Sequence, residues 1–169
     1  AGLARQRHFP AINWLSSYSL YPPSLDQWFR DNIEQDYPEI RTAISGLLQI
    51  EAELQEIVQL VGSDALPVDQ QLTLEVARMI REYFLQQNGF HEVDAFCSVD
   101  LHYKMAKAIL TFQESAKNAM AAGAELQDVV NVPARTELMR GRFESTYADE
   151  IDALVNKMNE EIAAAIVEN

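Results

Sequence analysis

From residue 24 onward, apolar residues recur at intervals of three, four and seven positions, which is the spacing of an amphipathic α-helix. The first such segment begins near Asp36, which can cap a helix, and Pro38, which suits an early helical position; it ends at Gly62. Its apolar positions are Ile40, Ile44, Leu47, Leu54, Ile57 and Val61. The pattern predicts a long helix with three acidic residues on its solvent side, namely Glu51, Glu53 and Glu56.

A second helical pattern follows the loop "GSDALPVD", which runs from Gly62 to Asp69. Asp69 is the predicted cap of this helix, and the segment "QQNGF" ends it at Asn88 and Gly89. The shared apolar face consists of Leu72, Val76, Ile80, Tyr83 and Phe84. Because the loop between the two helices is short, we expect them to pack antiparallel as a hairpin.

The remaining sequence is also helical in pattern. A third helix is expected from about Asp100 to Ala122, ending at Gly123, with Met105, Ile109 and Phe112 on one stripe. A short helix around Glu125 to Val130, another opened by Pro133 and a final one from about Ser145 to Val167 complete the chain. No stretch after residue 24 alternates with the period of two that a strand requires. The predicted fold class is therefore all-α, a bundle of about five or six helices.

The N-terminal segment "RQRHFPAINWLSSYSLYPP", Arg5 to Pro23, has neither the helical nor the strand period and is rich in aromatic residues. We therefore divide the chain into an irregular aromatic arm over residues 1–23 and a helical domain over 24–169.

Composition narrows the possible partners. The chain has 169 residues, 48% of them hydrophobic, which suits a single domain with a real core. Its net charge of -13 repels nucleic acid phosphates and anionic lipids, so neither nucleic acid nor a membrane surface is expected as a direct partner. The single cysteine, Cys97, excludes an internal disulfide and a thiolate metal cluster. Since no secretory signal is recognisable at the N-terminus, an intracellular location is expected.

The residues that usually carry catalysis are missing. None of the 6 glycines is followed by lysine, so the chain contains no P-loop and is not expected to hydrolyse ATP by itself. His8, His91 and His102 stand apart from one another and from any zinc-protease or di-iron spacing. We therefore expect neither a metal site nor catalytic residues within this chain.

Two segments carry a family resemblance. "RQRHFPAINWLSSYSLY" resembles the segment that leaves the nucleotide-binding domain of the catalytic A subunit of archaeal (A-type) and vacuolar (V-type) rotary ATPases; "PAINWL" and the acidity favour the archaeal form. The related catalytic subunits of F-type ATP synthases have a similar pattern, an aromatic followed by Pro-Ala, which here begins at Phe9. The segment "VGSDALPVDQQLTLEVARMIREYFLQQNGF", Val61 to Phe90, is similar to the family's acidic lever loop and the helix that follows it.

The resemblance implies two sets of functional residues. On the adenine side of the nucleotide site it places Phe9, Pro10, Phe84, Gln86, Gln87 and Phe90. In contact with the central rotor stalk it places Asp64, Ala65, Leu66, Pro67 and Asp69. This loop departs from the family pattern because only Asp64 and Asp69 are acidic and Pro67 stiffens it, so a steric push is expected rather than a grip through charge.

The resemblance also implies a setting. The parent subunit binds ATP or ADP with Mg²⁺, whereas no cofactor is expected in this chain alone. Its partners are a preceding nucleotide-binding domain, the B subunits of the ring and the central stalk, in the cytoplasmic head of a machine that couples ATP synthesis or hydrolysis to proton or sodium transport. The residue patterns alone leave an alternative open, a stand-alone helical protein-interaction module that binds a peptide or helix in an apolar groove.

Overall fold

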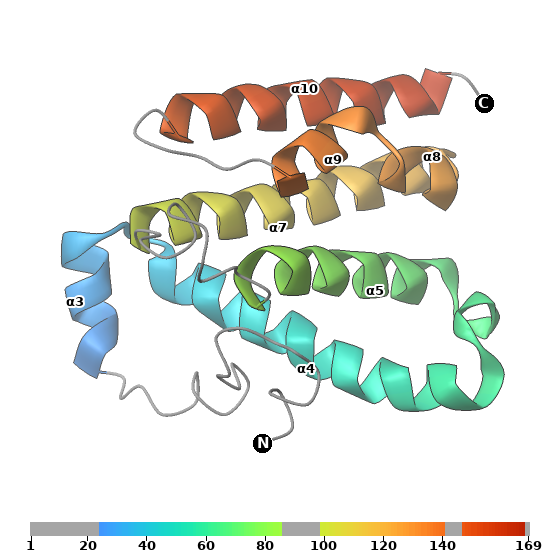
Figure 1. The fold of residues 1–169 in the computed structure, drawn as a ribbon, viewed down its shortest axis with the longest axis horizontal. Coiled ribbons are helices and arrows are strands. Elements are labelled where there is room, and N and C mark those ends of the chain that lie inside the picture. Colours follow the sequence, from blue (N-terminus) through green and yellow to red (C-terminus); the bar gives the residue numbers. More distant parts are fainter. Residues whose placement is uncertain (1–23, 86–98, 141–146, 168–169) are drawn as a thin grey trace.

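The computed structural model describes residues 24–85, 99–140 and 147–167, and within these ranges every regular element is helical (Figure 1). The all-α prediction is therefore confirmed. The predicted arm over residues 1–23 lies outside the described residues, so the boundary at residue 24 stays a prediction. The elements are α3 (Ser24–Asn32), α4 (Tyr37–Val61), the 3₁₀ turn η1 (Ser63–Ala65), α5 (Val68–Ile80), the π-helical turn η2 (Arg81–Leu85), α7 (Val99–Ala121), α8 (Leu126–Val130), α9 (Pro133–Arg140) and α10 (Tyr147–Val167).

Helix α7 occupies the middle of the molecule (Figure 1). It packs against α10 on one side and against α5 and α4 on the other, while α8 and α9 lie against α10. Side chains from all these layers form one continuous apolar cluster. Its fully buried members include Leu72, Met79, Ile109, Phe112, Leu138 and Met158. None of the described helices is long and apolar enough to cross a bilayer.

Helix ends follow local sequence signals closely. Gly62 and Gly123 both adopt positive φ, +85° and +110°, which stops α4 and α7 where a glycine tolerates the left-handed backbone. α9 begins at Pro133 as predicted, and α10 begins at Tyr147, close to the predicted start. α5 begins at Val68 behind Pro67, so the prediction that Asp69 caps this helix is wrong; Asp69 lies in its first turn.

Two acidic residues of the α4 segment also lie differently from expectation. Asp36 precedes the helix, but its side chain makes no capping hydrogen bond; its carboxylate instead accepts one from the Tyr103 hydroxyl of α7, 2.6 Å away. Glu51 is only 6% exposed, whereas Glu53 and Glu56 face solvent as predicted. The reason is spacing, since Glu51 follows Leu47 by four positions and therefore shares the inner face of the helix.

The last two turns of α4 are more exposed than their pattern predicts. Ile57 and Val61 were expected on the buried face, yet both are exposed, and no side chain from residue 55 to residue 61 is fully buried. A helix buries an apolar face only where a neighbour reaches it. Along this end of α4 the neighbouring elements leave that face open to solvent.

We expect core and tip leucines to differ sharply in their effect on stability. Leu72→Ala removes a fully buried side chain of α5 and should lower the free energy of unfolding by about 2–5 kcal/mol. Leu60→Ala, at a side chain that is 85% exposed, is the matched control and should change it by less than about 0.5 kcal/mol. Urea unfolding of the chain followed by far-UV circular dichroism measures both, and equal losses would contradict the described burial.

Candidate functional site

The tip of the α4–α5 hairpin, residues 57–69, is a short, internally bonded structure. The Gly62 amide donates to the Val58 carbonyl at 2.9 Å, and the Leu66 amide donates to the Ser63 carbonyl at 3.1 Å. The Gln71 side-chain amide donates to the Leu66 carbonyl at 2.9 Å, which ties the loop back to α5. These bonds hold the turn in one conformation, so the side chains around it are presented from a defined frame.

The structure brings the predicted rotor-contact residues together at this hairpin tip but divides them into two kinds. Asp64, Ala65, Pro67 and Asp69 are exposed, whereas Leu66 is 6% exposed and belongs to the core. Leu66 therefore anchors the loop from beneath, and the surface available to a partner is provided by its neighbours.

The hairpin tip also exposes large apolar side chains that the sequence pattern did not single out as a surface. Leu60 is 85% exposed and Val61 60%, and Ile57 and Val68 are about half exposed. Among the side chains whose burial the structure describes, the other large exposed apolar ones are those of Ile50, which also belongs to α4, and Trp28. Among the described side chains, apolar exposure is thus concentrated on the hairpin, and clustered apolar exposure is typical of an interaction surface.

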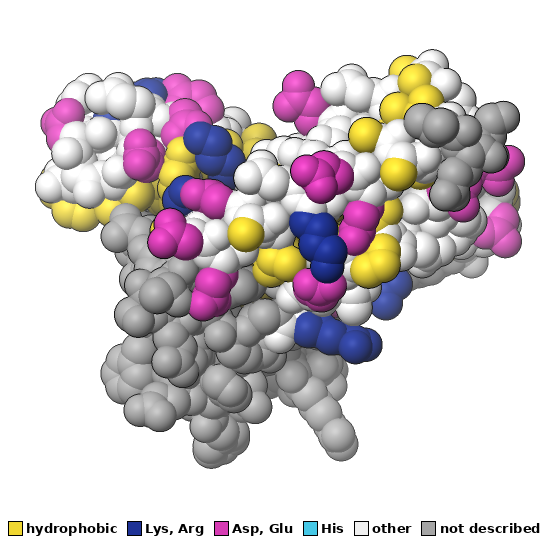
Figure 2. Space-filling model, turned by 90° about the horizontal axis from the view of Figure 1, so that it is seen from above, with side chains coloured by type: hydrophobic (Ala, Val, Ile, Leu, Met, Phe, Trp, Pro, Cys, Tyr) yellow, Lys and Arg dark blue, Asp and Glu magenta, His cyan; other side chains and the backbone are white. Residues whose placement is uncertain are grey.

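Charge is distributed just as unevenly. No basic residue occurs between Arg41 and Arg78 in the sequence. The acids of the same stretch are Glu51, Glu53, Glu56, Asp64, Asp69 and Glu75. On the face seen from above, by contrast, Figure 2 shows acidic and basic side chains interspersed. The hairpin tip therefore combines apolar and acidic groups, with no cation contributed by its own residues.

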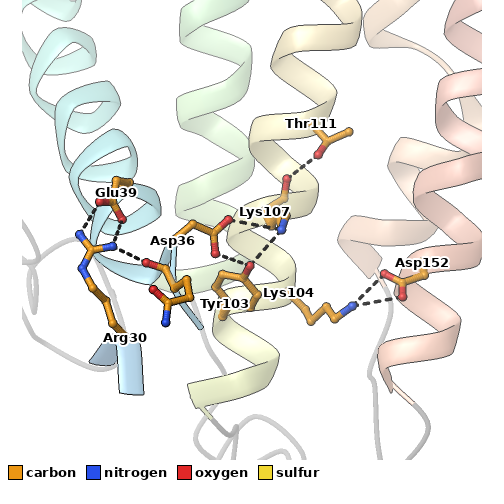
Figure 3. Close-up of polar contacts among 9 residues, drawn as sticks. Arg30, Asp36, Glu39, Tyr103, Lys104, Lys107, Thr111 and Asp152 are labelled. Carbon is orange, nitrogen blue, oxygen red and sulfur yellow. Dashed lines mark hydrogen bonds and ion pairs between the residues drawn. The ribbon is translucent and has the colours of Figure 1, made fainter. Parts of the chain in front are cut away.

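A polar network lies at the other end of α4 (Figure 3). Arg30 of α3 pairs with Glu39 and donates to the Gln35 carbonyl. Lys107 of α7 donates to the Asp36 carboxylate at 3.3 Å and to the Tyr103 oxygen at 3.0 Å. The hydrogen bond from Tyr103 is the main cause that lowers the pKa of Asp36, and Lys107 adds to it. This Asp36 network joins the start of α4 to α7 and fixes the inner end of the hairpin.

A cleft of about 330 Å³ adjoins this network, between α7 and α10. Lys104 and Lys107 are on its wall, but both pair with carboxylates: Lys104 with Asp152 at 3.1 Å, and Lys107 with Asp36. Because its cations are already engaged, we assign the cleft no ligand.

Most of the predicted adenine-side residues fall in other parts of the chain. Phe9, Pro10, Gln86, Gln87 and Phe90 lie outside the described residues. Phe84 belongs to the π-helical turn η2, of which the backbone path is described. Over residues 24–85, 99–140 and 147–167, no group of three or more His, Cys, Asp or Glu side chains is arranged to hold a metal ion.

Comparison with known proteins decides the family. The model of the "C-terminal domain of V and A type ATP synthase" matches residues 26–130, which span α3 to α8 and include the whole hairpin. The chain belongs to this family.

Curated relatives agree with that assignment. The A subunit of the A-type ATP synthase of Methanosarcina barkeri is 48% identical over 164 residues, covering 97% of this chain and 28% of the relative. Its counterpart from Methanosarcina mazei is 47% identical with the same coverage, and that from Natronomonas pharaonis is 48% identical over 96% of this chain and 28% of its own length. The resemblance drawn from the two motifs is thereby confirmed, and the chain spans 28% of the length of these relatives.

The Asp36 network generates a prediction about acid stability. Because the pKa of Asp36 is lowered in the folded state, its ionised form stabilises the fold above the pKa of the unfolded chain, and that contribution is lost as pH falls through the folded value. Tyr103→Phe removes the largest cause of the lowering, so the decline in unfolding free energy between about pH 5 and pH 2 should become shallower.

Urea unfolding at a series of pH values measures this decline. The control is the same change in an Asp36→Asn background, where Tyr103→Phe should leave the acid-side slope unaltered. An equal change of slope in both backgrounds would show that the effect does not pass through Asp36.

Proposed function

We propose that this chain acts as the C-terminal domain of the catalytic A subunit of a rotary A-type ATP synthase, and that the hairpin tip transmits movement to the central stalk. The observation that carries the proposal is the tightly bonded loop flanked by exposed Leu60, Val61 and Val68. An apolar surface on a rigid support can push a partner without deforming.

The dimensions of the hairpin suit a lever. α4 has 25 residues, which at 1.5 Å rise per residue give a length of about 37 Å. Its inner half packs against α5 and α7 through Ile44, Leu47 and Leu48, whereas its outer end carries the exposed tip. A rotation of the bundle therefore displaces the tip more than the packed end, and the packing keeps the hairpin from absorbing the movement.

Contact by shape is favoured over contact by specific charges. The loop itself offers only Asp64 and Asp69 as acids, while Pro67 restricts its backbone and Leu66 is buried beneath it. A surface charge pair contributes little and is screened by salt, whereas the bulk of the loop is unaffected by either.

For the nucleotide end we propose that Phe9, Pro10, Phe84, Gln86, Gln87 and Phe90 form the adenine side of the catalytic site. Aromatic faces next to a proline offer a preorganised stacking surface, and the glutamines supply hydrogen-bond partners. ATP or ADP with Mg²⁺ is then held mainly by a P-loop in a preceding nucleotide-binding domain of the same protein.

In this proposal the B subunits complete the ring, and the domain works in the cytoplasmic head, peripheral to the membrane. ATP synthesis or hydrolysis is coupled there to proton or sodium transport. A stand-alone interaction module could present the same tip, but similarity to relatives that are subunits of a synthase favours the role within a motor.

The lever role predicts that charge introduced at the hairpin tip uncouples ion pumping from ATP hydrolysis. In the full-length protein within its complex, the double change Leu60→Asp and Val61→Asp should lower the ions pumped per ATP hydrolysed by roughly two- to thirtyfold, because it replaces the apolar contact with buried charge. The double change Ala163→Asp and Ala164→Asp adds the same two charges at exposed positions of α10, outside the tip, and is the matched control. Ion pumping and ATP hydrolysis are measured together in reconstituted vesicles, and an unchanged ratio in the double variant would eliminate the tip as the contact.

The nucleotide role predicts a change in substrate affinity. Phe90→Ala in the same complex should raise KM for ATP by roughly two- to tenfold with kcat nearly unchanged, because stacking on adenine contributes equally to the ground and transition states. Trp28→Ala, which removes an exposed aromatic on α3, is the control. Steady-state ATPase kinetics provide the measurement, and an unaltered KM would remove Phe90 from the adenine side.

A further inference from the structure

Glu51 is unusual because it is a charged side chain inside the bundle. Among the charged side chains whose burial is described, no other is buried to this degree. Its carboxylate accepts a hydrogen bond from Nε of Arg81 at 2.6 Å, and the Arg81 side chain is 36% exposed. A carboxylate buried without a partner is strongly unfavourable, so the position of Arg81 is tied to that of Glu51.

This ion pair crosses the hairpin partway along α4, at the point where α5 ends. Glu51 is on α4, ten positions before Val61, which places it about 15 Å along the helix from the last residue of α4. Arg81 follows the last residue of α5, 30 positions further along the chain. In the described part of the chain no other ion pair joins α4 to α5.

Arg81 also marks a change in helix geometry. α5 ends at Ile80, and Arg81 is the first residue of the π-helical turn η2. Its amide donates to the carbonyls of both Ala77 and Arg78, four and three positions earlier, a shared hydrogen bond that is common where an α-helix ends. π-helical turns are rare, short and often found at functional sites. The bond to Glu51 thus holds the residue at which the regular α5 helix stops.

The Glu51–Arg81 pair resists a movement that apolar packing resists only weakly, the sliding of one helix along the other. Between Glu51 and the tip, Leu54 is the one buried residue of α4, and hydrophobic contacts of this kind resist separation better than sliding. A short charge-assisted hydrogen bond is directional and resists sliding of one helix along the other. A load that pushes the tip sideways bends the hairpin, and bending shears α4 along α5, which is the direction in which the pair holds them.

We propose that Glu51 and Arg81 are positioning residues that keep α4 and α5 in register, so that the hairpin moves as one body under load. The inference rests on the proposed lever function and adds to it one specific contact between the two helices, the Glu51–Arg81 pair, which we call the joint. Loss of the joint lets the two helices shift past each other, so that movement of the bundle is partly lost before it reaches the tip.

The test uses the complete complex with the full-length protein. Glu51→Gln should lower the ions pumped per ATP hydrolysed by roughly two- to thirtyfold. Glu82→Gln is the matched control, because it breaks the 2.9 Å Arg78–Glu82 pair, which is exposed and joins the end of α5 to the adjoining turn η2 without involving α4. That control should retain the ratio of the unmodified complex.

A second variant separates register from simple stability. In the double change Glu51→Leu and Arg81→Met the buried charge is removed together with its partner, so assembly should be preserved even where Glu51→Gln fails to assemble. A lowered pumping ratio in this double variant supports the proposal. A ratio equal to that of the unmodified complex in the double variant, or in an assembled Glu51→Gln complex, would overturn it, because the pair then serves stability alone.

The tip variants distinguish a failure of the Glu51–Arg81 proposal from a failure of the lever proposal on which it rests. If the Leu60 and Val61 changes lower the ratio and the Glu51 changes do not, the joint is refuted while the lever stands. If neither set lowers the ratio, the lever itself is refuted and the joint with it.

Discussion

The burial of α7 on two opposite sides is the constraint on which the rest of this structure depends. Its inward positions on both sides are buried, and several of them are alanines, including Ala106, Ala108, Ala116 and Ala119. Small residues let neighbouring helices approach closely, and the larger Ile109 and Phe112 fill the space between them. Because α10 and α5 both pack against this helix, its position sets the distance between the two halves of the bundle.

Ion pairs between elements complete this arrangement. Arg135 of α9 donates to the Glu75 carboxylate of α5 at 2.8 Å and to the Val130 carbonyl at 2.7 Å, and its guanidinium lies over the Phe112 ring of α7 at 5.4 Å. One side chain thereby connects three helical layers. At the opposite end the Asp36 network does the same for α4 and α7. The inner part of the hairpin is therefore fixed at several points.

The outer part of the hairpin, by contrast, is only partly covered by neighbouring helices. α5 is covered by α7, and α4 is covered only until about Leu54, so the last two turns of α4 extend with their apolar side chains open to solvent. In an isolated bundle this exposure is unfavourable, and it becomes useful only when a partner covers it. The same packing that stabilises the domain thus leaves one end of the hairpin free for contact, and Glu51 with Arg81 lies at the boundary between the two parts.

The sequence by itself determined the helices, most of their ends and the family. Those features depend on local properties: the 3.6-residue period, the left-handed backbone at Gly62 and Gly123, the proline that opens α9, and short motifs whose residues are contiguous. The hairpin and its loop followed from the same signals.

Only the tertiary structure decided the environment of individual side chains. Glu51 was expected in solvent although its spacing from Leu47 placed it on the inner face; its burial needed Arg81, which arrives from 30 positions away. Asp36 was expected to cap α4, but its carboxylate instead accepts a hydrogen bond from Tyr103 of α7. Ile57 and Val61 follow the apolar pattern of α4, yet both are exposed because no neighbouring element covers them. A local pattern states which side of a helix is apolar, but burial and pairing depend on which distant segments reach that side, and that is fixed only when the chain is packed.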